Sequence, residues 1–348
     1  MSSRSLIRIM SAGFLTAVLS YSCSSSKLAP SAVPAHAYKT DYKPASLPGV
    51  TAEYTLLTPN ATPHGIVLGP NGSVFFGEEY GHVIGRVTPQ GTVQEVPIAA
   101  FPAELTFDTS DNLWFTEPLL QAYVVKLAPS FQTTVYTIPS AGAAPPFPTG
   151  IVAQPAPSLA VWFTNPGTNT IGRIDGAGNI STFNAPGSPT GIALGSDSAF
   201  YFTELNGDAI GRMDFNGNLT NQYAVPTLSN LPTGITAGPS ASIWFTENGC
   251  LVKGPADCVY GKIGRLQGGA ITEFDAQSDP VSIILGDDGN LWFTASFANK
   301  IGRITPAGVV SLYPVPTSNS QPLDITNGPN RTIWFTERAA GKIGVLSY

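Results

Sequence analysis

The sequence contains seven copies of one short segment, and this repeat constrains the fold more than any other feature. The clearest copy is Leu-Trp-Phe-Thr at residues 291–294, followed by Lys-Ile-Gly-Arg-Ile at residues 300–304. An aromatic pair marks every copy: Phe75-Phe76, Trp114-Phe115, Trp162-Phe163, Tyr201-Phe202, Trp244-Phe245, Trp292-Phe293 and Trp334-Phe335. Successive pairs lie 39 to 48 residues apart, which is the period of a propeller blade. The repeat predicts an all-β protein, a seven-bladed β-propeller of four-stranded blades.

The composition suits many short strands joined by tight turns. Charged residues make up only 11% of the chain, whereas it contains 36 glycines and 31 prolines. The net charge is −6, and the Lys and Arg residues are spread through the repeats. A nucleic-acid partner would require a basic stripe. We therefore expect one folded domain over residues 51–348, a monomer with no nucleic-acid partner.

The ends of the repeat array predict how the ring closes. The last copy stops after its third strand, at residues 343–348, whereas residues 53–57 match a fourth strand and belong to no other copy. The N-terminal strand is therefore predicted to complete the last blade, which leaves only short sheet edges exposed.

The first 22 residues predict export. Arg4 and Arg8 precede a short apolar core from Ile9 to Leu19, which is too short to span a bilayer as a helix. Cys23 resembles the lipidated cysteine of a bacterial lipoprotein signal, and the alternative is an ordinary secretory signal. Residues 23–50 are rich in Ser, Ala and Pro and predict a flexible tether. We expect a periplasmic or secreted protein, or one tethered to a membrane through Cys23.

Two further cysteines lie in one insertion between the fifth aromatic pair and its Ile-Gly-Arg strand. Cys250 and Cys258 are only a few residues apart. In an exported protein such a pair usually forms a local disulfide, and the further ligands that a metal site requires are missing. We predict a disulfide.

One histidine breaks the rule of the repeat. The residue after the proline that opens each blade is small or apolar in six copies: Ala103, Thr149, Thr190, Thr233, Val281 and Leu323. In the first copy it is His64. Glu78 follows fourteen residues later, and a hairpin between them would place both side chains at one end of the blade. His82 stands in a slot that elsewhere holds Asn or Asp, which favours a role in the loop.

The aromatic-Phe-Thr-Glu and Lys-Ile-Gly-Arg segments, together with Pro-His-Gly-Ile at residues 63–66, resemble the virginiamycin B lyase family. The resemblance covers residues 51–348. It implies a propeller that opens a cyclic depsipeptide antibiotic by elimination at its ester, using a histidine base and Mg²⁺. It assigns His64 as the base and Glu78 as a Mg²⁺ ligand. Thr62 stands where the family has a second acidic ligand, and Leu323 where it has a substrate-binding histidine.

The fourteen-residue offset also recurs in other blades. It gives four more carboxylates at corresponding positions: Glu117, Glu204, Glu247 and Glu337. Facing the central channel, they would form an acidic mouth suited to a divalent cation. The alternative is that each glutamate caps its own hairpin through backbone hydrogen bonds. The repeated arginine of the Ile-Gly-Arg strand is predicted to make hydrogen bonds between blades.

Three functions remain open at this point. The first is a lyase with His64 as base and a metal held partly by Glu78. The second is a lactone hydrolase on the same scaffold, and the third is a non-catalytic binding propeller. In each case we expect a small molecule or peptide at the mouth of the central channel.

Overall fold

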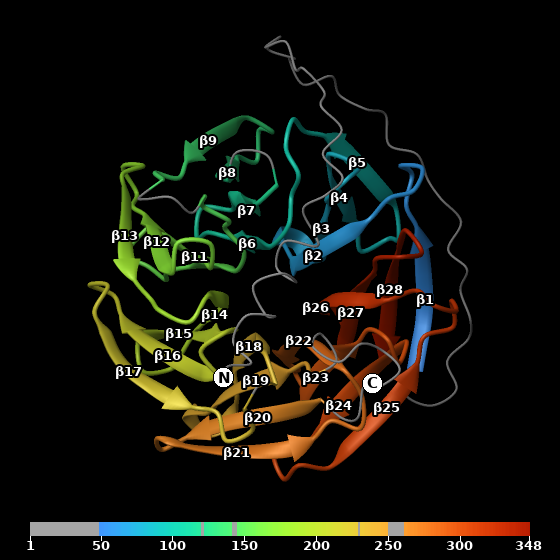
Figure 1. The fold of residues 1–348 in the computed structure, drawn as a ribbon. Coiled ribbons are helices and arrows are strands. Elements are labelled where there is room, and N and C mark those ends of the chain that lie inside the picture. Colours follow the sequence, from blue (N-terminus) through green and yellow to red (C-terminus); the bar gives the residue numbers. More distant parts are fainter. Residues whose placement is uncertain (1–48, 120–121, 141–144, 229, 250–260) are drawn as a thin grey trace, which may run out of the picture. The chain divides into compact units, whose positions relative to one another are not determined.

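A computed structural model describes residues 49–119, 122–140, 145–228, 230–249 and 261–348. These residues form seven four-stranded antiparallel sheets arranged as the blades of a propeller (Figure 1), which confirms the predicted fold. Cys23, Cys250 and Cys258 lie outside the described residues, as do the predicted signal and nearly all of the tether. The predictions made for them stay predictions. Within the described ranges, no helix has the length and apolar character needed to cross a membrane.

The strands follow one another outward from the centre in each blade. Blade 1 holds β2 (Pro63–Leu68), β3 (Val74–Glu78), β4 (Val83–Val87) and β5 (Val93–Pro97). Blade 2 holds β6 (Leu105–Phe107), β7 (Leu113–Glu117), β8 (Tyr123–Leu127) and β9 (Thr133–Thr137). Blade 3 holds β10 (Ile151–Ala153), β11 (Val161–Asn165), β12 (Thr170–Ile174) and β13 (Ile180–Asn184). Blade 4 holds β14 (Pro189–Leu194), β15 (Ala199–Glu204), β16 (Ala209–Asp214) and β17 (Leu219–Ala224).

The remaining three blades follow the same order. Blade 5 holds β18 (Pro232–Ala237), β19 (Ile243–Glu247), β20 (Lys262–Gln267) and β21 (Ala270–Asp275). Blade 6 holds β22 (Pro280–Leu285), β23 (Leu291–Ala295), β24 (Lys300–Ile304) and β25 (Val310–Pro314). Blade 7 holds β26 (Pro322–Gly328), β27 (Thr332–Glu337), β28 (Lys342–Ser347) and β1 (Gly49–Thr55). The short 3₁₀ turns η2 (Pro70–Gly72) and η3 (Pro239–Ala241) join the first two strands of blades 1 and 5.

The N-terminal strand closes the ring, as the sequence predicted. Strand β1 pairs with β28, so that Tyr54 lies opposite Ile343. The Tyr54 ring stacks on Trp334 with 5.4 Å between the ring centroids. Glu53 accepts hydrogen bonds from the backbone N and the Oγ1 of Thr317. Both ends of the folded region therefore belong to one blade.

The repeated residues have distinct roles inside a blade. The second aromatic residue is buried against the glycine of the Ile-Gly-Arg strand, and a Cβ on Gly302 would lie only 2.1 Å from Phe293 Cζ. The first aromatic residue lies under the repeated cation: Arg303 is 5.7 Å from the Trp292 ring centroid. The prediction of hydrogen bonds between blades was therefore wrong for most of these arginines. Each makes a cation–π contact within its blade, and Arg212 and Arg303 also form ion pairs with an aspartate of their own blade, whereas Arg265 donates to the Pro306 carbonyl of blade 6.

Threonines join the blades to one another. The Thr that follows the aromatic pair donates its hydroxyl to a carbonyl on the first strand or opening segment of the next blade. The donors are Thr116, Thr164, Thr203, Thr246, Thr294 and Thr336. Blade 1 has Gly77 at this place, and there the Gly65 backbone N donates to the Ala103 carbonyl. Contacts between blades thus explain why threonine recurs after the aromatic pair.

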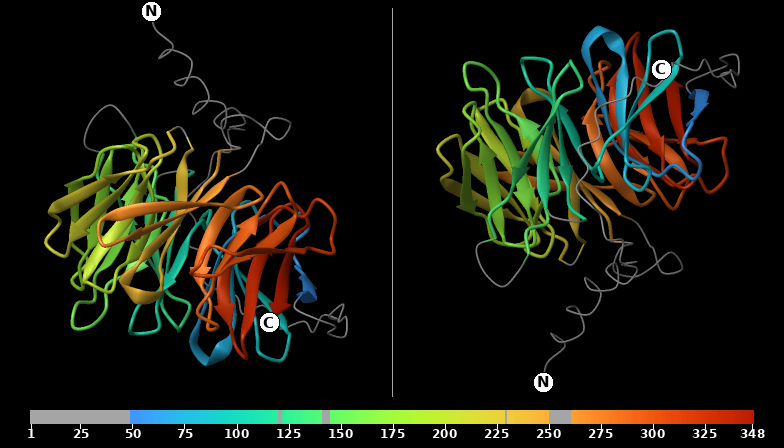
Figure 2. Two further views of the ribbon diagram at one scale, coloured as in Figure 1. Left: turned by 90° about the horizontal axis from the view of Figure 1, so that it is seen from below. Right: turned by 90° about the horizontal axis from the view of Figure 1, so that it is seen from above.

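The innermost strands face the centre of the ring. Each contacts its neighbours, and β2 contacts both β26 and β6, which closes the inner circle. In side view the strands run between two faces that carry the loops (Figure 2). Side chains at the start of each innermost strand therefore converge on one central space.

Candidate functional site

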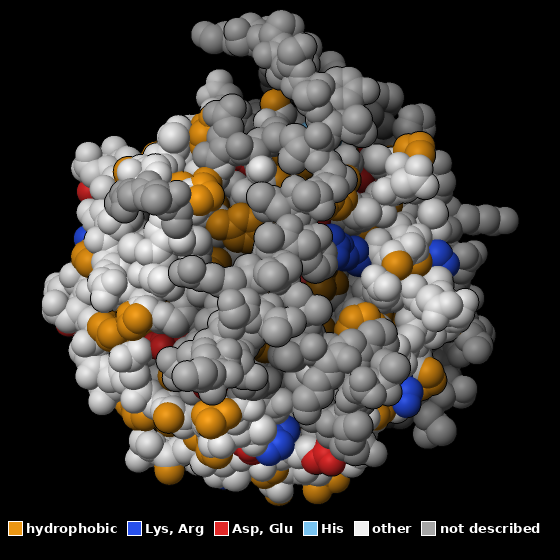
Figure 3. Space-filling model, viewed as in Figure 1, with side chains coloured by type: hydrophobic (Ala, Val, Ile, Leu, Met, Phe, Trp, Pro, Cys, Tyr) orange, Lys and Arg blue, Asp and Glu red, His pale blue; other side chains and the backbone are white. Residues whose placement is uncertain are grey.

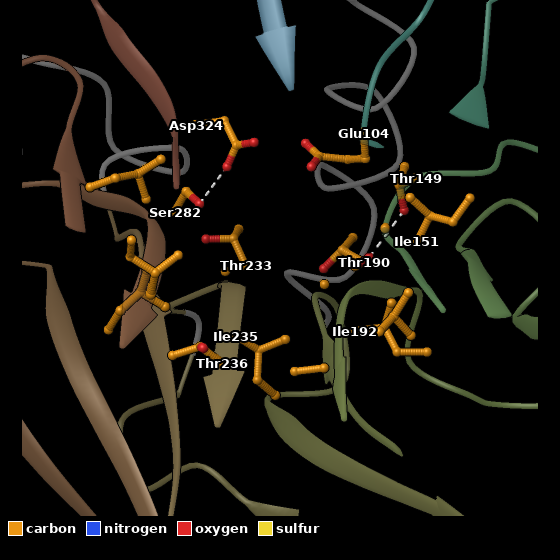
Figure 4. A pocket seen from close by; sticks show the side chains of 18 of the residues that line it. Glu104, Thr149, Ile151, Thr190, Ile192, Thr233, Ile235, Thr236, Ser282 and Asp324 are labelled. Atoms are coloured by element: carbon orange, nitrogen blue, oxygen red, sulfur yellow. Dashed lines mark hydrogen bonds between the residues drawn. The ribbon is translucent and has the colours of Figure 1, made fainter. Parts of the chain in front are cut away.

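The centre of the ring contains a cavity of about 520 Å³ (Figure 4). Every blade contributes to its lining through its innermost strand or the segment that leads into that strand. Each blade contributes a polar side chain, and blade 5 contributes a second one, Thr236. The seven that correspond from blade to blade are His64, Glu104, Thr149, Thr190, Thr233, Ser282 and Asp324. Isoleucines one or two residues further along line the cavity from six of the blades, and Leu105 does so from blade 2. The cavity is thus a polar ring next to an aliphatic one.

The lining departs from the repeat on one side only. Blades 3, 4 and 5 all read Pro-Thr-Gly-Ile, at residues 148–151, 189–192 and 232–235. The same four places read Pro-His-Gly-Ile in blade 1, Pro-Ala-Glu-Leu in blade 2, Pro-Val-Ser-Ile in blade 6 and Pro-Leu-Asp-Ile in blade 7. Blades 6, 7, 1 and 2 are contiguous around the ring. The unusual residues therefore gather on one wall, around His64.

His64 stands near an irregularity in β2. The pairing of β2 with β3 shifts between Pro63 and Ile66, and such an irregularity can redirect a side chain. The imidazole Nδ1 lies 3.5 Å from Glu104 Oε1, and 24% of the side chain is exposed. Nδ1 itself is buried, with no hydrogen-bond partner among the described residues. The exposed part of the ring is therefore elsewhere, toward the cavity.

The charge on His64 is set by opposing effects. Burial alone would lower its pKa, but the Glu104 carboxylate outweighs this, and the pKa of His64 is raised above its ordinary value. Glu79 adds to the rise, and Arg338 opposes it. Arg338 Nη2 is itself paired with Glu79 Oε2 at 3.1 Å.

The Asp324 side chain points toward that of Glu104 (Figure 4). Its Oδ1 accepts a hydrogen bond from Ser282 Oγ at 2.7 Å, and its Oδ2 accepts one from the Ile66 backbone N at 2.8 Å. Asp324 therefore ties blade 7 to the strand that carries His64. Burial, together with the nearby Glu104 carboxylate, raises the pKa of Asp324 to about 7.

Glu78 lies away from this cavity. It is opposite Pro63 in the β2–β3 pairing and is not among the residues that line the cavity, whereas His64 is one of them. Both Glu78 oxygens are buried, and the part of the chain that the structure describes offers them no hydrogen-bond partner. Burial and the neighbouring Glu95 raise its pKa to about 8. The predicted pairing of His64 with Glu78 is thus wrong: the partner of His64 is Glu104.

The other repeated glutamates do not form an acidic channel mouth either. Glu204 accepts two hydrogen bonds from Gln222 on the outermost strand, and Glu247 accepts one from Asn230. Glu337 has Glu53, also on an outermost strand, as a neighbour, and Glu117 is buried at the end of β7. None of these four residues lines the central cavity. They end the second strand of their blades, as Glu78 does in blade 1.

His82 has a local explanation. Its backbone φ is 53°, in the left-handed region that Asn, Asp and Gly favour, and its ring packs at 4.0 Å from the centroid of Phe101. The corresponding residues Asn169, Asp208 and Asn299 also have positive φ. The loop role predicted for this histidine agrees with that geometry.

A sequence model of the virginiamycin B lyase family matches residues 44–156 and 147–348. The chain belongs to the virginiamycin B lyase family.

Individual relatives agree with this membership. A virginiamycin B lyase from Nocardia farcinica (strain IFM 10152) is 31% identical over 175 residues, which cover 50% of this chain and 57% of the relative. The aligned stretch thus spans little more than half of that curated relative. A solved streptogramin B lyase structure is 31% identical with a TM-score of 0.75, covering 85% of this chain and 96% of the other.

A second solved relative is the virginiamycin B lyase from Staphylococcus aureus. It is 32% identical with a TM-score of 0.75, covering 85% of this chain and 98% of its own. The same values hold for a catalytically inactive His-to-Ala variant of that enzyme, solved with quinupristin. Charged side chains are visible at several separate places on the face shown in Figure 3.

The described residues do not bring further Mg²⁺ ligands together beside Glu78. Glu78 is not among the residues that line the cavity with His64, and Thr62 Oγ1 accepts a hydrogen bond from the Tyr80 backbone N. Across the described ranges, no group of three or more His, Cys, Asp or Glu side chains is placed to hold a metal ion. Mg²⁺ binding stays a prediction of the resemblance, and we derive no chemical step from it.

The sequence reasoning missed Glu104, Ser282 and Asp324. It compared the blades only at the position of His64, where the exceptions to Thr are otherwise apolar. The informative exceptions lie one residue later, where the regular blades have Gly. The same comparison applied to that position would have found all three.

Proposed function

We propose that this family member is a lyase of the virginiamycin B lyase type, which opens an ester in a cyclic or depsipeptide-like substrate by elimination. The observation that carries the proposal is the single imidazole that faces the central cavity with a carboxylate behind it. His64 would act as the base, and Glu104 would accept Nδ1–H. That arrangement leaves Nε2 free to remove a proton from the substrate.

The elimination balances without water. Nε2 takes a proton from the carbon next to the one that bears the ester oxygen. The electron pair of the broken C–H bond forms a C=C bond, the C–O bond to the ester oxygen breaks, and the carboxylate leaves. The product is a linear isomer of the cyclic substrate. A 3.5 Å separation is long for a hydrogen bond, but such contacts in ligand-free sites often shorten when substrate binds.

Mass spectrometry tests the proposal directly. Incubation with quinupristin should yield a linear product of unchanged mass, whereas a lactone hydrolase would add the mass of one water. His64→Ala should lower the rate by roughly 10²- to 10⁴-fold. His82→Ala is the matched control, because His82 lies in a turn outside the cavity, and it should keep most of the activity. Equal activity of the wild type and His64→Ala would refute the role of His64.

A non-catalytic binding propeller is the second candidate. Leu323, an apolar residue in the lining, and the engagement of Thr62 with Tyr80 favour it, because both occupy positions that the family uses for catalysis. Under this alternative, cyclic depsipeptides and lactones would bind without any change in mass, and no divalent cation would raise the melting temperature.

We also propose that the protein is exported. Arg4, Arg8 and the apolar run from Ile9 to Leu19 support this. The mass of the mature N-terminus, measured in membrane and soluble fractions, would separate a lipidated Cys23 from ordinary cleavage. Retention of the first 22 residues in both fractions would contradict export.

A further inference from the structure

The two carboxylates of the central cavity replace glycines of the repeat. Glu104 and Asp324 occupy, in blades 2 and 7, the place of Gly150, Gly191 and Gly234 in the regular blades. Blade 1 lies between blades 7 and 2, so the two side chains flank His64 and point toward each other across the cavity (Figure 4). His64 Nδ1 lies beside them, buried and 3.5 Å from Glu104 Oε1, without a well-formed hydrogen bond to any described residue. This wall is therefore built differently from the rest of the ring.

The cavity supplies no fixed cation to balance these carboxylates. Its described lining contains no Lys and no Arg, and the nearby Arg338 is already paired with Glu79. Burial and the Glu104 charge both raise the pKa of Asp324, and Glu104 raises the pKa of His64 against the effect of burial. His64 is thus the one group on the wall that can supply a positive charge, and it would have to lose that charge to act as a base.

The opposite part of the lining is aliphatic. Ile151, Ile192 and Ile235 come from the three regular blades. Each stands two residues after a threonine that also lines the cavity. Those threonines are engaged with neighbouring threonine hydroxyls, as in the pair Thr190 and Thr203 at 2.9 Å. An apolar ligand group can therefore bind on this side without desolvating any polar group that lacks a hydrogen bond.

We propose that the cavity selects a ligand that carries a protonated amine next to an apolar group, with the amine between Glu104 and Asp324 and the apolar group on the isoleucines. The two carboxylates are specificity-determining residues. This inference relies on the proposed function only in placing the substrate in this cavity. The ligand amine would also supply the positive charge that His64 gives up, so that binding favours the neutral imidazole.

Benzylamine and benzyl alcohol are suitable probes, because they share a ring and differ in charge. A ligand-observed NMR titration at pH 7 should show benzylamine binding at least about tenfold more tightly than benzyl alcohol. Glu104→Gln and Asp324→Asn should each remove most of this preference, and Glu104→Asp should restore part of it. Asp197→Asn is the matched control, a carboxylate outside the cavity that pairs with Arg212, and it should change nothing.

Two results would overturn the proposal. One is equal binding of the two probes, and the other is a preference for benzylamine that survives both carboxylate substitutions. Melting temperatures would show that each variant is folded, and Glu104 tolerates replacement because 35% of its side chain is exposed. No depsipeptide is used in this test. A protein that binds benzylamine but leaves depsipeptides intact would keep this inference and lose the proposed function.

Discussion

His64 is the residue on which the proposed chemistry depends, and its charge can be followed by pH. The raised pKa means that the imidazole is neutral, and able to accept a proton, only above its ordinary titration range. Activity should therefore rise with pH through this pKa. Glu104→Gln removes the neighbouring negative charge, so the pKa of His64 should fall and the acidic limb of the profile should move to lower pH.

A pH–rate profile of both proteins, together with NMR titration of the imidazole, measures this shift. A purely structural Glu104 would leave the position of the limb unchanged while lowering stability. An acidic limb at the same pH in the wild type and Glu104→Gln would therefore contradict the pairing of His64 with Glu104.

At the scale of single residues, the sequence predicted the base and missed its partner. His64 was found because it is unique among seven equivalent positions. Its assignment to Glu78 failed because counting along one hairpin ignores the irregular β2–β3 pairing, which sets Pro63 rather than His64 opposite Glu78. The true partner, Glu104, comes from the next blade. Only the closed ring brings these two residues together.

At the scale of one blade, a half-buried lysine accompanies two carboxylates. In blade 5, Lys262 Nζ lies 2.6 Å from Glu273 Oε2, and Glu247 is opposite Lys262 in the strand pairing. Lys342 occupies the same place beside Glu53 and Glu337 in blade 7. Blade 6 has Lys300 at this position, but Ala295 and Leu312 stand where the other two blades have the carboxylates. Lys300 is therefore a matched control for Lys262, because it occupies the same position without the two carboxylates.

Lys262→Met should destabilise the protein by about 1–3 kcal/mol more than Lys300→Met, because it leaves two partly buried carboxylates without their positively charged partner. The pKa of Glu273 is lowered, partly by Lys262, so its contribution to stability is present above its unfolded pKa and is lost as pH falls. The deficit of Lys262→Met should therefore be small near pH 4 and full at neutral pH. Melting curves across pH measure it, and equal deficits for both lysines would refute the argument.

Between neighbouring blades, the repeat threonine provides a second test. Thr294 Oγ1 donates to the Leu323 carbonyl at 2.7 Å and accepts from the Ser282 backbone N at 3.1 Å. Thr294→Val keeps the shape and leaves both backbone groups unpaired, which should cost about 1–3 kcal/mol. Thr305→Val, at an exposed turn, is the control and should change stability little. Chemical denaturation of both variants measures the difference, and equal effects would contradict the role given to Thr294.

For the whole molecule, the sequence was sufficient to predict the architecture. The repeat predicted the number of blades. The unmatched N-terminal strand and the missing fourth strand of the last copy together predicted how the ring closes. The repeat could not reveal which way its glutamates point, because a strand position shared by several blades is compatible with an outward or an inward side chain. Nor could it reveal contacts between blades, such as those of the threonines, because they join residues of different copies.

Closure through β1 is the property of the whole ring most open to experiment. A chain that begins at Pro59 lacks β1, exposes the edge of β28, and loses both the Tyr54–Trp334 stacking and the contacts of Glu53 with Thr317. A chain that begins at Pro48 keeps the strand and is the control. We expect the shorter chain to be insoluble or to melt at a much lower temperature. A synthetic peptide of residues 48–58 should restore part of the stability by adding the missing strand. Equal melting of the two chains would mean that the ring closes without β1.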